Sequence, residues 1–504
     1  MCLKYKNSRK AKIFPAIFLL DNLINNANLM TLFSSLLFIF LFLPITLLMY
    51  YGAKDKWKNI VLFIMSLTFY AWGEPVYVLL MIFSTIVDYT HGMKVEENLN
   101  KGNRKKAFRY VISSAIINLS LLGFFKYADF IVSNVNIVFN TNIPLLHLPL
   151  PIGISFYTFQ TMSYTIDIYR GDAKAQKSVI DFGTYVALFP QLVAGPIVRY
   201  QTVADQINKR THSEEKFADG VNRFCIGLGK KVILSNQLAV VADGVFNAAI
   251  GNISVLESWL GIICYTLQIY FDFSGYSDMA IGLGKMFGFD FLENFNYPYI
   301  SKSISEFWRR WHISLGSWFR DYVYIPLGGS RVSKLKIYRN IFVVWFLTGM
   351  WHGAEWTFVI WGLLYGLIIA MERAFLNEWL EKRSNIFRHI YVLATVTLLF
   401  VIFRSLTIGD AIEFYKVMFG LSNNPIASNQ LYIYIIDYWY VIIAAMILST
   451  PVVKIAKEYI NSKINVNESK SLQILYGLSL SMCVLVSTIM LCSSTYNPFL
   501  YFRF

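Results

Sequence analysis

Long apolar runs separated by short polar loops recur along nearly the whole chain. Four of them are residues 33–51, 110–125, 341–353 and 391–403. Several runs approach the roughly 20 residues that an α-helix needs to cross a hydrocarbon core about 30 Å thick. Others are short or interrupted, as expected of segments that enter the membrane without crossing it. The pattern predicts an all-α polytopic membrane protein with about eleven transmembrane and re-entrant helices.

Composition supports a membrane protein and excludes several classes of soluble enzyme. The 504 residues are 56% hydrophobic and only 15% charged, which is too apolar for an ordinary soluble domain. The five cysteines show no CxxC or other metal-ligand spacing, so we interpret them as small buried hydrophobic residues. The sequence contains no complete phosphate-binding glycine loop, no HExxH motif and no Gly-x-Ser-x-Gly motif. We therefore expect neither a bound cofactor nor a metal.

The basic residues give the chain a formal charge of +14, but they lie in short loops between apolar runs. Loop 94–109 has six Lys and Arg residues, and segment 302–340 has eight, against two acidic residues. The positive-inside tendency makes both loops cytoplasmic, so the charge sets orientation and does not indicate a nucleic-acid partner. We expect 302–340 to be a cytoplasmic amphipathic segment and 341–371 to be the helix region that follows it.

The extreme N-terminus conflicts with this orientation. Five basic residues before residue 13 would be carried to the outside of the membrane, against the same tendency. Either translation begins at Met30, or residues 13–30 form an additional segment that dips into the membrane. The apolar stretch is too short to favour a cleaved signal peptide. We treat residues 1–29 as an N-terminal extension and residues 30–504 as a single transmembrane domain.

His352 lies inside an apolar run, and an ionisable residue in a membrane span is a candidate functional residue. If the helix starts near Ile341, a rise of about 1.5 Å per residue places the imidazole roughly 16 Å along it, near the middle of the membrane. Gly349 and Gly353 flank the histidine, so the helix can be approached closely or broken there. A neutral imidazole in such a site can accept a proton from a hydroxyl. The alternative is a histidine that only joins two helices by a hydrogen bond.

Tryptophans are concentrated around this histidine, because seven of the twelve fall in one stretch of the chain. Trp308, Trp311 and Trp318 fit an aromatic belt at the membrane interface. Trp351 and Trp356 are too deep for a belt.

Two aspartates, Asp272 and Asp278, lie in another apolar run. A carboxylate in a membrane span is costly unless it is paired or faces a cavity. We expect both to form hydrogen bonds that stabilise a bent helix.

His312 lies in a basic amphipathic stretch, FWRRWHISLGSWFRDY, together with Arg309, Arg310 and Arg320. This stretch is typical of a short helix at the cytoplasmic interface, where basic residues and tryptophan anchor a protein to lipid headgroups. A second interpretation, compatible with the first, is a port at which the arginines attract an anionic donor from the cytosol.

Several long motifs resemble those of the membrane-bound O-acyltransferases, in the branch of the alginate and peptidoglycan O-acetyltransferases and the teichoic acid D-alanyl transfer protein. In chain order they are PIGISFYTFQTMSYTIDIYRG (151–171), FPQLVAGPIVR (189–199), QIYFDFSGYSDMAIGLGKMFGF (268–289), WRRWHISLGSWFRDYVYIPLGG (308–329) and WHGAEWTFVIWG (351–362). The resemblance spans about residues 30–500 and implies a ring of helices around a thin centre pierced by a funnel. The WHG histidine of the family corresponds to His352, and the histidine of its RRWH motif corresponds to His312.

The resemblance also implies an activity. Members of this branch move an acetyl group from a cytosolic thioester donor, acetyl-CoA or an acyl carrier, across the bacterial cytoplasmic membrane. The final acceptor is an exported polysaccharide, usually reached with a secreted or periplasmic acetyltransferase partner. His352 would act as general base on the attacking hydroxyl, and an indole or backbone N–H at Trp351 or Gly353 would stabilise the oxyanion. His312 would lie on the donor side of a substrate tunnel, and the candidate residues of this tunnel are Trp351, Trp356, Arg309, Arg310 and Asp272. Whether the immediate acceptor is a partner protein or the sugar stays open.

Two other classes of protein fit part of the pattern. A proton-coupled transporter also needs intramembrane His and Asp residues and broken helices, but the sequence shows no internal repeat. The remaining hypothesis is a non-enzymatic membrane anchor of an acetylation complex. Consumption of an acetyl donor by the purified protein separates the enzyme from both.

Overall fold

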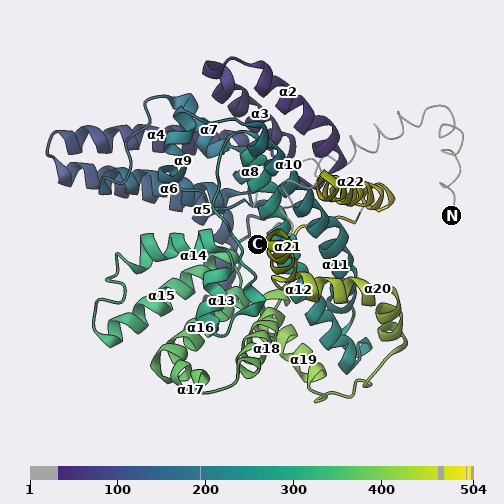
Figure 1. Ribbon diagram of the computed structural model, residues 1–504. Helices are drawn as coiled ribbons and strands as arrows, with labels where there is room; N and C mark the ends of the chain where they lie inside the picture. The colour runs from purple at the N-terminus through teal and green to yellow at the C-terminus, as the bar shows by residue number, and fades with distance from the viewer. Residues whose placement is uncertain (1–31, 193–194, 464–469, 495, 501–504) are drawn as a thin grey trace, which may run out of the picture.

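The computed structural model describes residues 32–192, 195–463, 470–494 and 496–500 (Figure 1). Every regular element within these ranges is a helix, which confirms the predicted all-α class. The expected N-terminal extension, residues 1–29, lies outside the described residues.

The first half of the described chain forms helices of very different length. They are α2 Leu43–Gly52, α3 Lys58–Gly73, α4 Val78–Asn100, α5 Arg104–Phe139, α6 Ile154–Arg170, α7 Val179–Ala187, α8 Phe189–Leu192, α9 Tyr200–Asn208, α10 Glu214–Gly229 and α11 Asn236–Phe246. A π-helical segment, Lys230–Ser235, joins α10 to α11, so the two run on as one long helix. α5 ends at Asn140, whose left-handed backbone, with φ of 48°, is a common way to stop a helix.

The second half begins with the long helix α12 and continues with shorter ones. They are α12 Val255–Met286, α13 Ile304–Arg310, α14 Ile313–Phe319, α15 Lys334–His352, α16 Trp356–Met371, α17 Asn377–Glu381, α18 Asn385–Arg404, α19 Ile408–Met418, α20 Asn429–Leu448, α21 Val452–Lys463 and α22 Lys470–Ser493. Ser254 and Glu257 form a reciprocal capping box that starts α12, and this pairing satisfies backbone N–H groups that a helix start leaves open.

Six helices of the described chain are long and apolar enough to cross a membrane. They are Arg104–Phe139, Glu214–Phe246, Trp356–Glu381, Asn385–Arg404, Asn429–Leu448 and Ser471–Ser493. A shorter apolar helix covers Phe38–Gly52. These spans confirm a multi-pass membrane protein, while the exact number of helices in a ring around a funnel stays a prediction.

α12 runs through the middle of the assembly (Figure 1), and most of its side chains are buried. α10 and α11 pack along it. Glycines allow the backbones to approach: a Cβ atom on Gly227 would lie 2.5 Å from the carbonyl oxygen of Gly275, and one on Gly282 would lie 2.6 Å from that of Gly220. Small residues at helix contacts are typical of membrane bundles, because they let packing and backbone contact replace the missing hydrophobic driving force.

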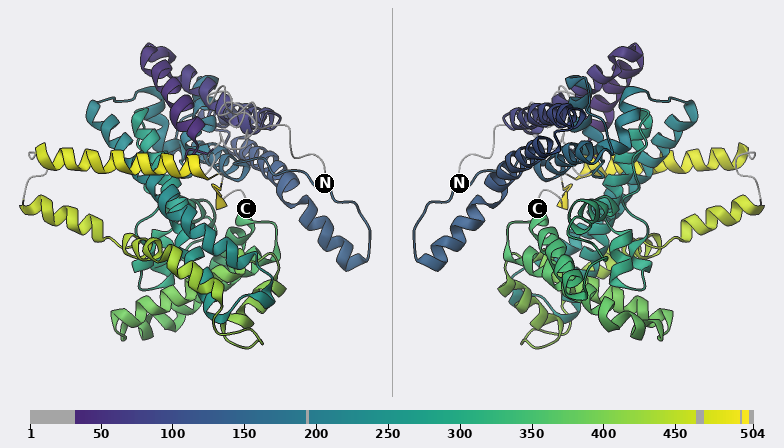
Figure 2. Two further views of the ribbon diagram at one scale, coloured as in Figure 1. Left: turned by 90° about the vertical axis from the view of Figure 1, so that its right-hand side faces the viewer. Right: turned by 90° about the vertical axis from the view of Figure 1, so that its left-hand side faces the viewer.

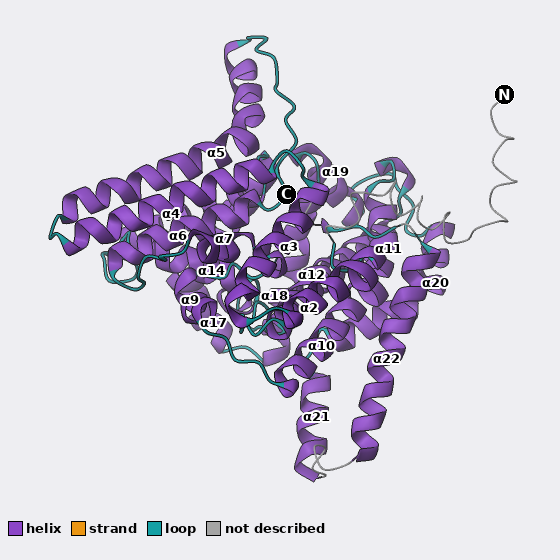
Figure 3. Ribbon diagram, turned by 90° about the horizontal axis from the view of Figure 1, so that it is seen from above, coloured by secondary structure: helices purple, strands orange, loops and turns teal. Residues whose placement is uncertain are grey.

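Two groups of helices extend from this centre. α4, α5 and α6 lie together on one side in Figure 1, where the buried carboxylate of Asp88 on α4 accepts hydrogen bonds from Ser114 and Asn118 on α5. α21 and α22 project on the side opposite to the end of α5 (Figure 2). The view from above shows the same two projections (Figure 3). The site described below lies between them, around α12 and the end of α15.

Buried side chains form two apolar clusters that meet at the end of α15. Trp318 and Trp351 belong to the first cluster, whereas Trp311, Trp345 and Trp361 belong to the second. α12 contributes side chains to both clusters. The end of α15 is therefore enclosed from both sides by packed aromatic residues.

Candidate active site

The helix that carries the candidate histidine, α15, ends at that residue. It has 19 residues and starts at Lys334, seven residues before Ile341, so His352 lies about 27 Å along its axis. Hydropathy does not mark the true start, because the first turns carry Lys334, Lys336 and Arg339, which are exposed and extend the helix beyond its apolar part. Gly353 has an extended backbone, with φ of −165°, and ends the helix directly after the histidine.

Glycines bring α15 and α16 close together around this end. A Cβ atom on Gly353 would lie 2.2 Å from the ring of Phe358, and one on Gly349 would lie 2.4 Å from the carbonyl oxygen of Phe358. A Cβ atom on Gly362 would lie 2.4 Å from the carbonyl oxygen of Trp345. The two glycines predicted to flank a break therefore permit a tight helical hairpin, as the sequence suggested.

Side chains from α5 hold the end of α15 through its main chain. Lys126 Nζ donates to the carbonyl oxygen of Trp351 at 2.5 Å and to that of His352 at 3.4 Å. The hydroxyl of Tyr127 donates to the carbonyl oxygen of Met350 at 2.6 Å. The last carbonyl groups of a helix lack partners within the helix, and a cation is favourable beside them. The sequence analysis missed Lys126, although a lysine within an apolar run is the signal that would have found it.

The imidazole of His352 is 7% exposed and packs among aromatic rings. The ring centroids of Trp351, Trp361 and Phe403 lie 5.1, 5.2 and 5.3 Å from that of His352. The interplanar angles of these three pairs are 82°, 85° and 79°, so all are edge-to-face contacts. Water is thus largely excluded from the histidine, which strengthens every electrostatic interaction around it.

A cavity of about 20 Å³ opens beside His352, which is room for about one water molecule. Its lining comes from five helices and from the segment after α22, and it includes Asp272 and Phe273 of α12, Trp308 of α13, Trp361 of α16, Phe403 of α18, and Leu500. His352 and Asp272, two of the residues predicted for the site, therefore line one cavity. Its walls are otherwise almost entirely apolar.

Asp272 is part of a buried ion pair at the wall of this cavity. Its carboxylate lies 2.5 Å from Lys231 Nζ, and the two side chains are 2% and 0% exposed. The amide of Leu500 donates to Asp272 at 2.9 Å, and Lys231 donates to the carbonyl oxygen of Pro498. Asp272 therefore does more than stabilise its own helix, since the pair fixes segment 498–500 against the cavity.

His312 lies between two short helices where the sequence suggested one amphipathic helix. α13 ends at Arg310 and α14 starts at Ile313, and His312 has a left-handed backbone with φ of 45°. Histidine is among the few residues that are enriched in this conformation. The side chain is 2% exposed, and its Nδ1 lies 3.2 Å from Asn294 Oδ1. His312 is therefore buried in the protein at the junction of the two helices.

Trp351 connects the two histidines. Its ring centroid lies 5.8 Å from that of His312 and 5.1 Å from that of His352. The structure thus brings His312, Trp351 and His352 together, although forty residues separate the two histidines in the sequence.

Three other tryptophans, assigned above to an interfacial belt, pack against the protein core instead. Trp308 and Trp311 line the cavity beside His352. Trp318 is 4% exposed, stacks on Phe159 with centroids 3.8 Å apart, and donates to its carbonyl oxygen at 3.0 Å. The belt interpretation is wrong for these residues because the break at His312 folds the segment into the protein.

The remaining candidates of the tunnel lie away from the cavity. Trp356 is 55% exposed, and its indole N–H donates to Asn134 Oδ1 at 2.9 Å. Arg309 is exposed, and Arg310 pairs with Glu306 at 2.9 Å on the same helix. The structure therefore does not bring these three side chains to His352.

Among the described residues, no group of three or more His, Cys, Asp or Glu side chains is arranged to hold a metal ion. The groups around the cavity are an imidazole, a paired carboxylate and indoles. This set can move a proton and donate hydrogen bonds.

Comparisons with known proteins identify the family of the chain. The model of the membrane-bound O-acyltransferase family matches residues 22–379. A probable alginate O-acetylase of Pseudomonas aeruginosa is 46% identical over 77% of this chain and 75% of its own length, and one of Pseudomonas putida is 41% identical over 94% of this chain and 100% of its own. The peptidoglycan O-acetyltransferase of Helicobacter pylori is 36% identical over 78% of this chain and 80% of its own. The family match covers the helices that carry both histidines, and the chain belongs to the membrane-bound O-acyltransferases, as an O-acyltransferase that crosses the membrane several times.

Proposed function

We propose that the protein transfers acetyl groups from a cytosolic thioester donor across the cytoplasmic membrane of a bacterium, for O-acetylation of an exported polysaccharide of the alginate or peptidoglycan class. The names of the relatives support the acyl group and the acceptor class. The observation that carries the mechanism is the position of His352, which lines a cavity at the end of a broken helix. A general base must meet both the donor and the attacking hydroxyl, and such a position suits it.

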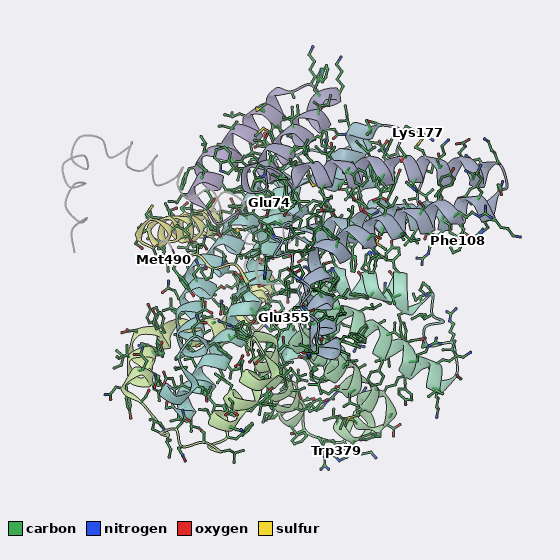
Figure 4. All side chains as sticks on the ribbon, turned by 180° about the vertical axis from the view of Figure 1, so that it is seen from behind. Glu74, Phe108, Lys177, Glu355, Trp379 and Met490 are labelled. Carbon is green, nitrogen blue, oxygen red and sulfur yellow. The ribbon has the colours of Figure 1, made fainter. Side chains whose placement is uncertain are left out.

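The tip of the α15–α16 hairpin lies close to both His352 and the protein surface, which supports a route by which an acceptor reaches His352. His352 is buried, whereas Glu355, three residues later, is exposed. Figure 4 shows Glu355 near the middle of the molecule in the view from behind. Only a short stretch of backbone therefore separates the histidine from a surface where an acceptor hydroxyl could arrive.

In the proposed reaction, the oxygen of the acceptor hydroxyl attacks the carbonyl carbon of the thioester. His352 accepts the hydroxyl proton as the new carbon–oxygen bond forms. The tetrahedral intermediate then collapses, the carbon–sulfur bond breaks, and the proton passes from the imidazolium to the departing thiolate. The products are an acetyl ester and the free thiol, so no further reactant is needed. The immediate acceptor is a hydroxyl of a secreted acetyltransferase partner or of the sugar itself.

Purified protein in lipid vesicles tests this proposal. Acetyl-CoA supplied on the side of residues 302–340 is expected to release free thiol when a hydroxyl acceptor is present, and the His352→Gln protein is expected to release little. If thiol is released only when the donor is supplied on the opposite side of the membrane, the proposed orientation of the protein is wrong. A protein that binds partners but never consumes donor would favour the anchor hypothesis, and proton uptake without donor consumption would favour a transporter.

A further inference from the structure

Two tryptophans beside His352 have buried indole N–H groups without a hydrogen-bond partner among the residues that the structure describes. They are Trp308 on α13 and Trp361 on α16, and both line the cavity that His352 lines. Buried donors are almost always paired in proteins, so an unpaired donor needs an explanation such as a bound water or a catalytic role. Here two such donors lie at one cavity.

Three other indole N–H groups of the described chain do have hydrogen-bond partners. Trp259 donates to the carbonyl oxygen of Met418 at 2.9 Å, and Trp318 donates to that of Phe159 at 3.0 Å. Trp356, although exposed, donates to a side-chain oxygen at 2.9 Å. Tryptophans in this fold can therefore satisfy their indole N–H groups, and the two cavity residues Trp308 and Trp361 do not do so within the described chain.

Both rings are held rigidly where the reaction is proposed to occur. The centroid of Trp361 lies 5.2 Å from that of His352, and the centroid of Trp308 lies 5.6 Å from that of Trp361. Trp308 also packs edge-to-face on Tyr365 at 5.0 Å. Donors fixed by packing in a site without bulk water need no rearrangement when negative charge develops, which is the requirement for oxyanion stabilisation.

We infer that the indole N–H groups of Trp308 and Trp361 form the oxyanion site of the acyl transfer. They donate hydrogen bonds to the thioester oxygen as it becomes negatively charged, while His352 takes the proton of the hydroxyl. This inference rests on the proposed function. It replaces the amide of Gly353 as the donor, because that N–H already donates to the carbonyl oxygen of Gly349 at 3.3 Å.

The test compares Trp308→Phe and Trp361→Phe, which keep an aromatic ring and remove the N–H. Each is expected to lower kcat by about 10²-fold while KM for acetyl-CoA stays within about threefold, because an oxyanion donor acts mainly in the transition state. Trp345→Phe is the matched control. The ring centroid of Trp345 lies 4.8 Å from that of Trp308 in the same aromatic cluster, but Trp345 does not line the cavity. The kcat of the Trp345→Phe protein is therefore expected to stay near that of the parent protein.

A donor in which sulfur replaces the carbonyl oxygen of the acetyl group gives a second readout. Sulfur accepts hydrogen bonds poorly, so the parent protein is expected to slow sharply with this donor, and the two phenylalanine variants are expected to slow much less. A structural role of the indoles would lower the melting temperature without changing this ratio. Parent-like kcat in both variants, or an unchanged oxygen-to-sulfur ratio, would overturn the inference. Full activity of His352→Gln would instead overturn the proposed base.

Discussion

The two histidines of this site lie at the ends of two helices, and different contacts fix the two helix ends. His352 is the last residue of α15, and the contacts that fix this end join Lys126 and Tyr127 to main-chain carbonyl groups. His312 precedes α14, and its ring nitrogen lies within hydrogen-bond distance of Asn294, which also accepts from the amide of Ser314 at 3.1 Å. The end of α15 is thus held through its main chain, whereas the ring of His312 joins a network with Asn294.

From this difference we expect the two histidines to have different roles in the reaction. Anchoring through the backbone fixes the position of His352 and lets its ring face the cavity, as a general base requires. The ring of His312 is part of the network that shapes the junction of α13 and α14. The ring of Trp351 packs against both histidines. We therefore expect His312 to position the donor side of the site and His352 to carry the proton transfer.

Loss of His352 is expected to have the largest effect. His352→Gln keeps hydrogen-bonding capacity but removes the proton acceptor, and it should lower acetyl transfer by about 10²–10⁴-fold at equal protein level. His352→Ala should be about as inactive. The measurement is ester content of the exported polysaccharide together with thiol release by the purified protein. Near-normal transfer by the glutamine variant would identify His352 as a structural hydrogen-bonding residue.

Removal of Lys126, which holds the main chain at the end of α15, is expected to have the second-largest effect. Lys126→Met should lower kcat by about 10²-fold, because a small displacement of a catalytic group is enough for a loss of that size. Tyr127→Phe removes a comparable bond to the neighbouring carbonyl of Met350 and is the matched control, with a much smaller expected loss. Lys126→Arg should recover part of the activity. If Lys126→Met retains parent kcat, anchoring by the backbone does not position His352.

A third test measures how much the buried ion pair at the cavity wall contributes to the stability of the protein. Asp272→Asn leaves Lys231 buried without its counter-charge and is expected to cost about 3 kcal/mol of unfolding free energy. Asp278→Asn is the control on the same helix, since its partners Arg223 and Lys230 are 33% and 28% exposed and remain hydrated. Thermal melting in detergent measures both. Equal melting temperatures for the two variants would show that burial of the Asp272 pair is not what matters.

Two substitutions distinguish the contribution of the His312 ring from that of its left-handed backbone. His312→Asn keeps a residue that accepts the left-handed conformation and should lower transfer about tenfold, equivalent to about 1.4 kcal/mol for one lost hydrogen bond. His312→Ala should add backbone strain of about 1 kcal/mol and melt at a lower temperature. A rise in KM for the donor, with kcat little changed, would support the positioning role. A loss as large as that of His352→Gln would remove the distinction between the two histidines.

The smallest effect is expected at Trp356. Its indole is largely exposed and bonds to Asn134, so Trp356→Phe should leave transfer within about twofold, as is usual for surface changes. The assay is the same thiol release. A loss of transfer above tenfold would support the assignment of Trp356 to the substrate tunnel.

The sequence by itself determined the class of the protein and its central histidine. Apolar runs of membrane length are a local property, so hydropathy alone predicted a helical multi-pass protein. An ionisable residue in such a run, flanked by glycines, directed attention to His352, and the structure places both glycines at close backbone contacts. The motifs also pointed to the family that the comparisons establish.

Tertiary structure alone decided which side chains surround that histidine. Lys126 lies 226 residues before His352 in the sequence, and Trp308 and Trp361 come from separate helices, so no local periodicity could pair them. The left-handed turn at His312 moved Trp308 and Trp311 from an expected membrane interface into the cavity wall, while Trp356 faced outward one turn beyond His352. Depth in a membrane span follows from sequence position, but the direction of a side chain follows from helix packing.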